Sequence, residues 1–178
     1  MRTRNIILLI VLLVIIDQAA KLIIYHSFMD INCEIIPQLL DFKPTFNSKY
    51  SFVNDSIYKK TGMDAGLTFH IILFPLIWFV LFLFYRFFKG IAPNNKMLDI
   101  SFCFLTAGYI CGYLGILVWE KGVLDFLYFK LLGGVIFDLK DMYIDCYIVF
   151  FIISTMRIEK EHKIELKHMA SYLKDLFK

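Results

Sequence analysis

Long apolar blocks alternate with polar stretches along the chain, and four blocks have the length and composition of helices that cross a membrane. They cover about residues 5–24, 68–88, 98–119 and 139–156. A helix of roughly 20 apolar residues spans the hydrocarbon core of a bilayer. The pattern therefore predicts an all-α membrane protein with four transmembrane helices, formed by a single membrane-embedded domain over 1–178.

The first block also resembles a secretory signal peptide, because Arg2 and Arg4 precede an apolar core at 6–16. Two charged residues follow this core, the apolar pattern resumes at Leu22, and no convincing small-x-small cleavage site is present. We therefore expect the first block to be a retained helix.

The polar stretch at 25–66 is broken by Pro37 and Pro44 and is longer than a simple connector. Connections of this length are often functional. Its segments 33–42 and 45–53 have a short mixed pattern that fits either strands or an interfacial segment, and periodicity does not choose between them. The stretch predicts a small extracytoplasmic subdomain of strands and loops.

Basic residues give the expected orientation. All four arginines fall at the N-terminus, between the second and third spans, or in the tail at 157–178, which share one side of a four-span protein: Arg2, Arg4, Arg86 and Arg157. Cytoplasmic segments are enriched in such residues. We expect both termini in the cytoplasm, with 25–66 and 123–141 at the outer face. The charged tail fits a helix on the membrane surface or a solvated segment.

Composition agrees with a membrane protein, since 59% of the residues are hydrophobic and 17% are aromatic. The net charge of +3 is too small to indicate nucleic-acid binding. The cysteines show neither a disulfide framework nor metal-ligand spacing, and we expect them to act as small apolar side chains. They are Cys33, Cys103, Cys111 and Cys146. We expect no metal or organic cofactor.

Two aspartates at the edges of apolar segments are the main candidates for chemistry. Asp125 lies in VLDFLYF and Asp141 precedes the last apolar block, while Gly133 and Gly134 allow a turn between them. Ionisable groups at the ends of membrane helices are often functional, and two close carboxylates share a proton. The alternatives are a helix N-cap for Asp141 and a solvated interfacial charge for Asp125.

Other charged residues surround this pair in the sequence. Asp17 and Lys21 are one helical turn apart and can pair, either as a snorkelling pair at the helix end or as an inward pair that orients the site. Lys140 could act on Asp141, but we expect its side chain to point to water. Asp145 should share a helix face with Asp141.

Four motifs, in order, resemble those of the lipoprotein signal peptidase (signal peptidase II) family. DQAAK at 17–21 matches Asp-Gln-x-x-Lys, and FNSKYSF at 46–52 resembles Asn-x-Gly-x-Ala-Phe. VLDF at 123–126 matches Val-Val-Asp-Phe, and FDLKD at 137–141 matches Phe-Asn-x-Ala-Asp. The resemblance covers roughly 6–153.

The resemblance implies an aspartyl endopeptidase of the bacterial inner membrane with Asp125 and Asp141 as the catalytic pair. The substrate would be a prolipoprotein with a diacylglyceryl-modified cysteine, cleaved before that cysteine in contact with membrane phospholipid. We expect a monomer inhibited by globomycin-type compounds. Supporting or substrate-binding residues would be Asp17, Lys21, Asn47, Gly112 and Asp138.

The chain also departs from the family pattern. The family motif Gly-Asn-x-x-Asp-Arg corresponds to residues 112–117, which read GYLGIL. This segment keeps Gly112 but lacks the Asn, Asp and Arg of the motif. Asp138 replaces the family Asn, Lys140 the Ala and Lys49 the Gly. An alternative function is therefore an inactive relative that binds lipoproteins or a partner membrane protein.

Overall fold

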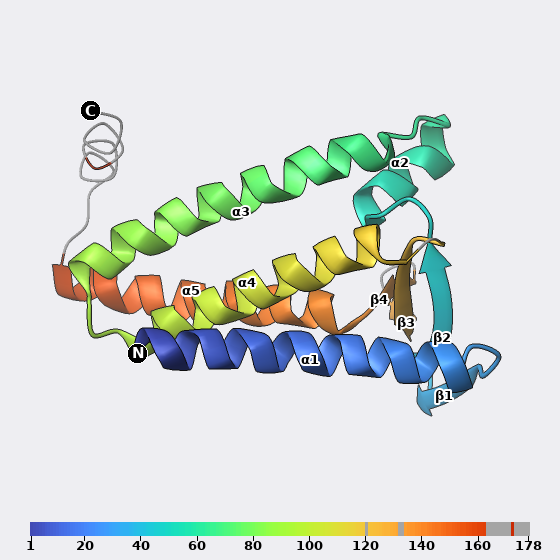
Figure 1. Cartoon of the computed structure of the whole chain (residues 1–178), viewed down its shortest axis with the longest axis horizontal. Coiled ribbons are helices and arrows are strands. Elements are labelled where there is room, and N and C mark those ends of the chain that lie inside the picture. The colour runs from blue at the N-terminus through green and yellow to red at the C-terminus, as the bar shows by residue number, and fades with distance from the viewer. Residues whose placement is uncertain (120, 132–133, 163–171, 173–178) are drawn as a thin grey trace.

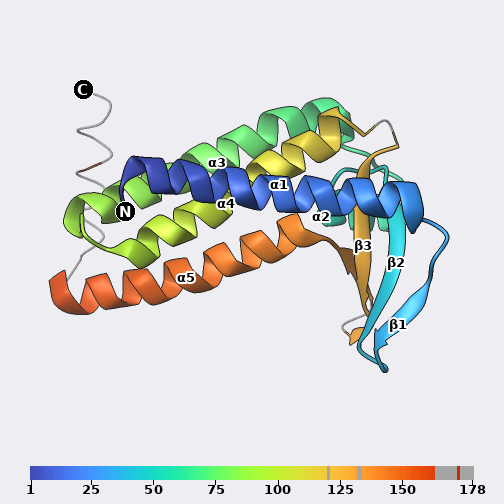
Figure 2. The same ribbon diagram turned by 60° about the horizontal axis from the view of Figure 1, so that its bottom comes forward.

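The computed structural model describes residues 1–119, 121–131, 134–162 and 172. Within them, the long helices run along one common axis (Figures 1 and 2). Helix α4 lies at the centre, because half of its apolar stretch is buried, against 11% in α1 and 6% in α3. The bounds are α1 Thr3–Ser27, α3 Gly66–Ile91, α4 Lys96–Leu117 and α5 Leu139–His162.

A small antiparallel sheet with strand order β1-β2-β3-β4 stands at one end of the helices (Figure 1). Its register pairs Asn47 with Val123 and Leu127 with Phe137, so segments far apart in the sequence meet there. The strands are β1 Cys33–Ile36, β2 Leu40–Asn47, β3 Val123–Phe129 and β4 Val135–Phe137, and α2 Phe52–Thr61 follows β2.

The open question about the outer stretch is thus resolved. The segment 33–42 forms strands, whereas 45–53 begins as strand and ends as helix. Helix α2 starts at this point because Ser51 caps it, its hydroxyl accepting the N–H of Asn54 at 3.2 Å. The predicted β/loop subdomain is confirmed, with a helix in addition.

Two glycines bring the site elements together. A side chain at Gly108 of α4 would come within 2.8 Å of Ile144 and 3.2 Å of the Lys140 carbonyl, so α5 packs directly on this residue. Gly122 has φ 101° and lies against the backbone of Asn47. Because only glycine fits such a position without strain, it allows the chain to enter β3 beside β2.

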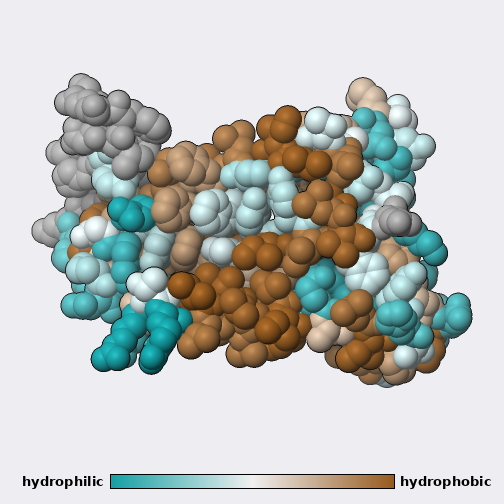
Figure 3. Space-filling view, in the orientation of Figure 1, coloured by the Kyte–Doolittle hydropathy of each residue, from teal (hydrophilic) through white to brown (hydrophobic). Residues whose placement is uncertain are grey.

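Among the described residues, three helices are long and apolar enough to cross a membrane: α1, α3 and α4. Helix α5 does not meet this criterion, because Lys140, Asp141 and Asp145 lie near its start and Arg157 near its end. The predicted four spans are therefore not confirmed, and three candidate spans are found. Figure 3 shows apolar side chains over the middle of the helices and hydrophilic side chains at both ends, the arrangement expected for a membrane protein.

The N-terminus, the connection between α3 and α4 and the end of α5 lie at the end of the molecule away from the sheet (Figure 1). The N-terminus and the end of α5 therefore lie at the same end of the molecule, while the C-terminus itself falls outside the described residues. The predictions for Gly133 and for most of the tail at 157–178 fall on residues outside the described ranges.

Candidate active site

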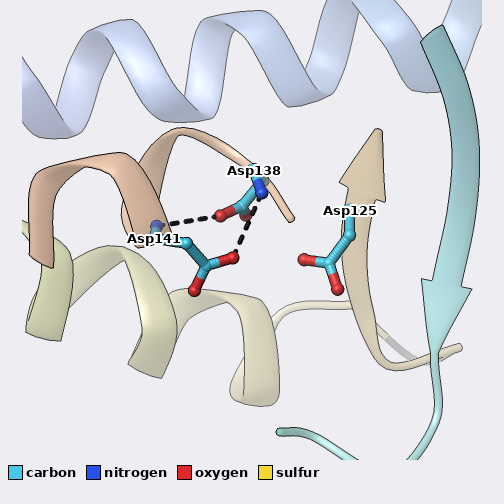
Figure 4. Close-up of side chains that lie close together, drawn as sticks. All are labelled: Asp125, Asp138 and Asp141. Atoms are coloured by element: carbon cyan, nitrogen blue, oxygen red, sulfur yellow. Dashed lines mark hydrogen bonds between the residues drawn. The ribbon is translucent and has the colours of Figure 1, made fainter. Parts of the chain in front are cut away.

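Three carboxylates converge where the sheet meets the start of α5 (Figure 4). Asp125 comes from β3 and has a side chain only 7% exposed, and its neighbours in the strand, Leu124 and Phe126, are also buried. Asp138 and Asp141 lie on either side of the first residues of α5. One oxygen of each carboxylate lies within 4.8 Å of one oxygen of each of the others.

Local helix chemistry fixes the second and third carboxylates. Asp138 immediately precedes α5, and its Oδ1 accepts the N–H of Asp141 at 3.3 Å. In return, Oδ2 of Asp141 accepts the N–H of Asp138 at 3.1 Å (Figure 4). This reciprocal arrangement is a capping box. The helix cap is therefore Asp138, and the alternative that assigned this role to Asp141 was wrong.

Lys140 lies among the three carboxylates. Its Nζ is 2.9 Å from Asp125, 2.9 Å from Asp138 and 3.1 Å from Asp141. The prediction that it points to water was wrong, because the first turn of α5 directs it inward. Gly112 of α4 leaves room for the stem of Lys140, whose Cδ would be 4.0 Å from a side chain added there.

A second buried lysine links α1 to this cluster. Lys21 and Asp17 are both fully buried and lie 2.9 Å apart, and Lys21 also contacts Asp138 at 2.7 Å. The inward-facing alternative is therefore correct for this pair. Carboxylates and ammonium groups alternate through the cluster, from Asp17 to the two candidate catalytic aspartates.

The neighbouring charges act differently on two of the carboxyl groups. Burial raises the pKa of Asp125 above its ordinary value, although the ammonium of Lys140 opposes this effect. Burial acts on Asp138 in the same direction, but Lys140 and Lys21 outweigh it and lower its pKa. Asp138 is thus held as a carboxylate, whereas Asp125 retains a proton more readily than an exposed aspartate.

A cavity of about 580 Å³ opens beside this cluster. Asp125 and Asp141 both line it, and the side chain of Asp141 is 43% exposed. Within the described residues, only Oδ2 of Asp141 makes hydrogen bonds to the protein, which leaves Oδ1 for water or substrate. The lining also includes Asn47, Tyr50, Ser51, Phe74, Lys140 and Asp145.

A second and more apolar cavity, of about 460 Å³, lies between α3, α4 and α5. It shares Phe74, Lys140 and Asp141 with the first cavity, and Gly112 lines it. An extended apolar group could thus lie between the helices and still reach the carboxylates.

The structure places each supporting residue. Asp17, Lys21 and Asp138 belong to the charged cluster, and Gly112 contacts the stem of Lys140. Asn47 is at the cavity rim, but its Oδ1 accepts the N–H of Lys49 at 2.9 Å and so stabilises its own turn.

The positions where the family has polar residues are occupied differently. Tyr113 donates a hydrogen bond to the carbonyl of Ile71 at 2.7 Å, Ile116 is buried, and Leu117 is exposed. None of the three lines either cavity described above. The only cation that contacts both candidate catalytic aspartates in the described part of the chain is Lys140.

Sequence reasoning missed a polar pair at the cavity. Ser51 lines the cavity, and its hydroxyl lies 3.0 Å from Nε2 of His70, whose Nδ1 is 2.7 Å from the carbonyl of Gly66. Because a carbonyl only accepts, Nδ1 donates, and in the neutral ring Nε2 accepts from Ser51. These residues are far apart in the sequence and carry no common motif.

The three carboxylates are also the one candidate metal-binding group among the described residues. Carboxylate oxygens suit Mg²⁺ or Ca²⁺. Here the ammonium of Lys140 contacts all three and offsets part of their negative charge.

The fold and site define a helical membrane protein with a buried aspartate cluster at the edge of a small sheet. Comparison of the sequence with known families then gives a match to the model of signal peptidase (SPase) II over residues 9–157. The chain belongs to this signal peptidase II family. Members of the family are membrane proteases that process lipoproteins.

Solved structures support the fold. One is described as a bacterial membrane enzyme solved at 1.9 Å. It is 24% identical in sequence and has a TM-score of 0.65, and the match covers 86% of this chain and 94% of the solved chain. A second structure, also described as a bacterial membrane enzyme and solved at 2.3 Å, is 22% identical in sequence with a TM-score of 0.63. This match covers 92% of this chain and 94% of the solved chain. No curated protein matches the sequence.

Proposed function

We propose that the chain is an active aspartyl endopeptidase that removes signal peptides from diacylglyceryl-modified prolipoproteins, cleaving before the lipidated cysteine. The observation that carries the proposal is the convergence of Asp125 and Asp141 on one cavity, from separate elements of a chain that belongs to signal peptidase II. The protein would act as a monomer in the bacterial inner membrane. Its termini would be cytoplasmic, and its site would face the outer leaflet.

The two aspartates divide the chemistry between them. One carboxylate takes a proton from water as the water oxygen attacks the scissile carbonyl carbon, while the other, protonated, gives its proton to the carbonyl oxygen. The tetrahedral intermediate then collapses, the C–N bond breaks, and the leaving nitrogen takes a proton from the pair. The raised pKa of Asp125, which follows from its burial, supports a proton shared between the two carboxyl groups.

The cavities suggest where the substrate lies. The backbone around the scissile bond would occupy the cavity beside Asp125 and Asp141. Apolar parts of the substrate, its acyl chains or its signal helix, would occupy the cavity between α3, α4 and α5. The exposed apolar surface of the helices would contact membrane phospholipid.

A second candidate function is an inactive relative that binds lipoproteins or a membrane protein. Two observations favour it. Lys140 contacts both aspartates, and 113–117 lacks the family's polar residues.

A gel-shift cleavage assay separates the two functions. Purified protein in detergent receives a diacylglyceryl-modified prolipoprotein, with the unmodified precursor and a globomycin-type inhibitor in parallel. Asp141→Asn is the inactive variant, and Asp99→Asn, a buried aspartate at the other end of α4, is the matched control. Cleavage by the native chain and the control alone supports the enzyme. No cleavage by a folded native chain, beside an active family enzyme, together with retention of the lipidated precursor, supports the binding protein.

A further inference from the structure

Two departures from the family pattern form a single ion pair in the structure. Asp138 stands for Asn and Lys140 for Ala, and their charged groups lie 2.9 Å apart. Together they add one negative and one positive charge, so the net charge beside Asp125 and Asp141 is unchanged. Either change alone would alter that net charge by one unit in a largely buried site.

Lys140 is placed to act on the catalytic pair and not only on its neighbour. Its ammonium contacts one oxygen of Asp125 and one of Asp141, at 2.9 Å and 3.1 Å. Its side chain is 13% exposed, so water screens these contacts less than on a surface. Asp138 is fully buried and is itself held by Lys21 at 2.7 Å, which fixes the anchor of the ammonium.

We propose that Lys140, anchored by Asp138, is a positioning residue whose ammonium group offsets the carboxylate of Asp138 beside the catalytic aspartates and thereby maintains the pH range in which the enzyme cleaves. This inference rests on the proposed function. The ammonium favours the ionised form of each aspartate, while the carboxylate of Asp138 favours the protonated form. These two effects oppose each other. When Lys140 and Asp138 are both charged, the catalytic pair therefore shares one proton over about the same pH range as it would if both positions were neutral.

Other charged groups face the same region. Lys21 and Asp17 approach Asp138 from α1, and Asp145 of α5 lines the cavity. From α3, His70 bonds to Ser51 at the cavity. Lys140 differs from all of these because it contacts both catalytic aspartates directly.

The proposal predicts opposite effects for the two halves of the pair. Lys140→Met leaves the carboxylates without their shared cation, so ionisation of the catalytic pair requires higher pH. The pH profile of cleavage should move upward by about 1–3 units. Asp138→Asn removes the opposing carboxylate, keeps a good helix cap, and should move the profile downward. The double variant Asp138→Asn/Lys140→Ala should return close to the native profile.

Charge and contact can be separated with two further variants. Lys140→Arg keeps the positive charge, so its profile should stay near the native one. Lys130→Met is the matched control, because Lys130 also bridges two carboxylates, Glu34 at 2.6 Å and Asp41 at 2.8 Å, but lines neither cavity. It should leave the profile unchanged.

The experiment measures kcat/KM for the lipidated precursor against pH for these five variants and the native chain. In parallel, carboxyl ¹³C NMR titrates Asp125 in the substrate-free proteins, with Asp125→Asn to assign its signal. An upward move for Lys140→Met, a downward move for Asp138→Asn and return in the double variant support the proposal. A Lys140→Met profile that overlays the native one overturns it. If the chain is not an endopeptidase, no variant cleaves the precursor at any pH. The NMR titration of Asp125 then still tests whether Lys140 shifts the ionisation of this carboxyl group.

Discussion

Two clusters of buried charge lie at opposite ends of the helices. Away from the sheet, Asp99 of α4 is fully buried and accepts the hydroxyl of Tyr85 at 2.9 Å. Its carboxylate also pairs with Lys89 at 2.6 Å and with the amino group of Met1. At the sheet end, by contrast, three carboxylates surround one lysine beside a cavity.

The difference between the clusters lies in the access of solvent to the carboxylate oxygens. Both oxygens of Asp99 are occupied by protein donors and no part of the residue is exposed. Asp141 is 43% exposed and has an oxygen that no described protein group contacts. A cavity that reaches a free carboxylate oxygen therefore distinguishes the candidate catalytic Asp141 from Asp99.

The largest expected effect tests this comparison directly. Asp125→Asn and Asp141→Asn should each reduce the cleavage rate by about 100- to 10,000-fold, because each removes one of the two groups that exchange protons with the substrate. Initial rates on the lipidated precursor measure the loss, and thermal unfolding in detergent shows that the variants are folded. Native rates in either variant would exclude the aspartyl mechanism.

Lys21→Met tests the structural part of the sheet-end cluster. It leaves Asp17 and Asp138 without their shared ammonium in a fully buried position, so the free energy of unfolding should fall by about 3–5 kcal/mol. Denaturant unfolding in detergent measures it. The control is Lys59→Met, which breaks a pair of the same spacing with Asp55 in which Lys59 is 72% exposed, and should cost at most about 1 kcal/mol. Equal losses in both variants would contradict the buried network.

Asp99→Asn should give the reverse of the pattern expected for the candidate catalytic aspartates. The variant should lose about 1–3 kcal/mol of unfolding free energy, because the ion pairs of Asp99 with Lys89 and with the amino group of Met1 are lost, and keep the native cleavage rate. Unfolding and initial rates on the same sample test both parts. A catalytic defect in a stably folded variant would break the distinction between the two clusters.

Effects of similar or smaller size concern two glycines of α4. Gly112→Ala meets only ordinary contacts, 3.8 Å from Phe74 and 4.0 Å from Lys140, so it should gain about 0.5–1 kcal/mol from helix propensity. Gly108→Ala would come within 2.8 Å of Ile144 and should lose stability by about 1–3 kcal/mol. Thermal unfolding of the pair measures the difference. The reverse order would contradict the packing of α4 on α5.

Several site features follow from local sequence patterns. The apolar blocks predicted the long helices because burial in lipid requires a continuous run of apolar residues, and the charges near the ends of 139–156 explain why α5 alone misses the composition of a span. Asp17 and Lys21 were predicted to pair because helical periodicity fixes residues one turn apart. The choice between a water-facing and an inward pair needed the contact with Asp138 from another element.

The sequence by itself determined the helical membrane architecture, the family motifs and the two candidate aspartates, because these depend on local hydrophobicity and on residues close in the chain. Tertiary structure alone decided the direction of Lys140, the pairing of Ser51 with His70 and the cavity that reaches Asp141. A lysine beside an aspartate can extend into water or turn inward with equal local geometry. Its direction here depends on carboxylates brought from β3 and the start of α5, and on the space left by Gly112.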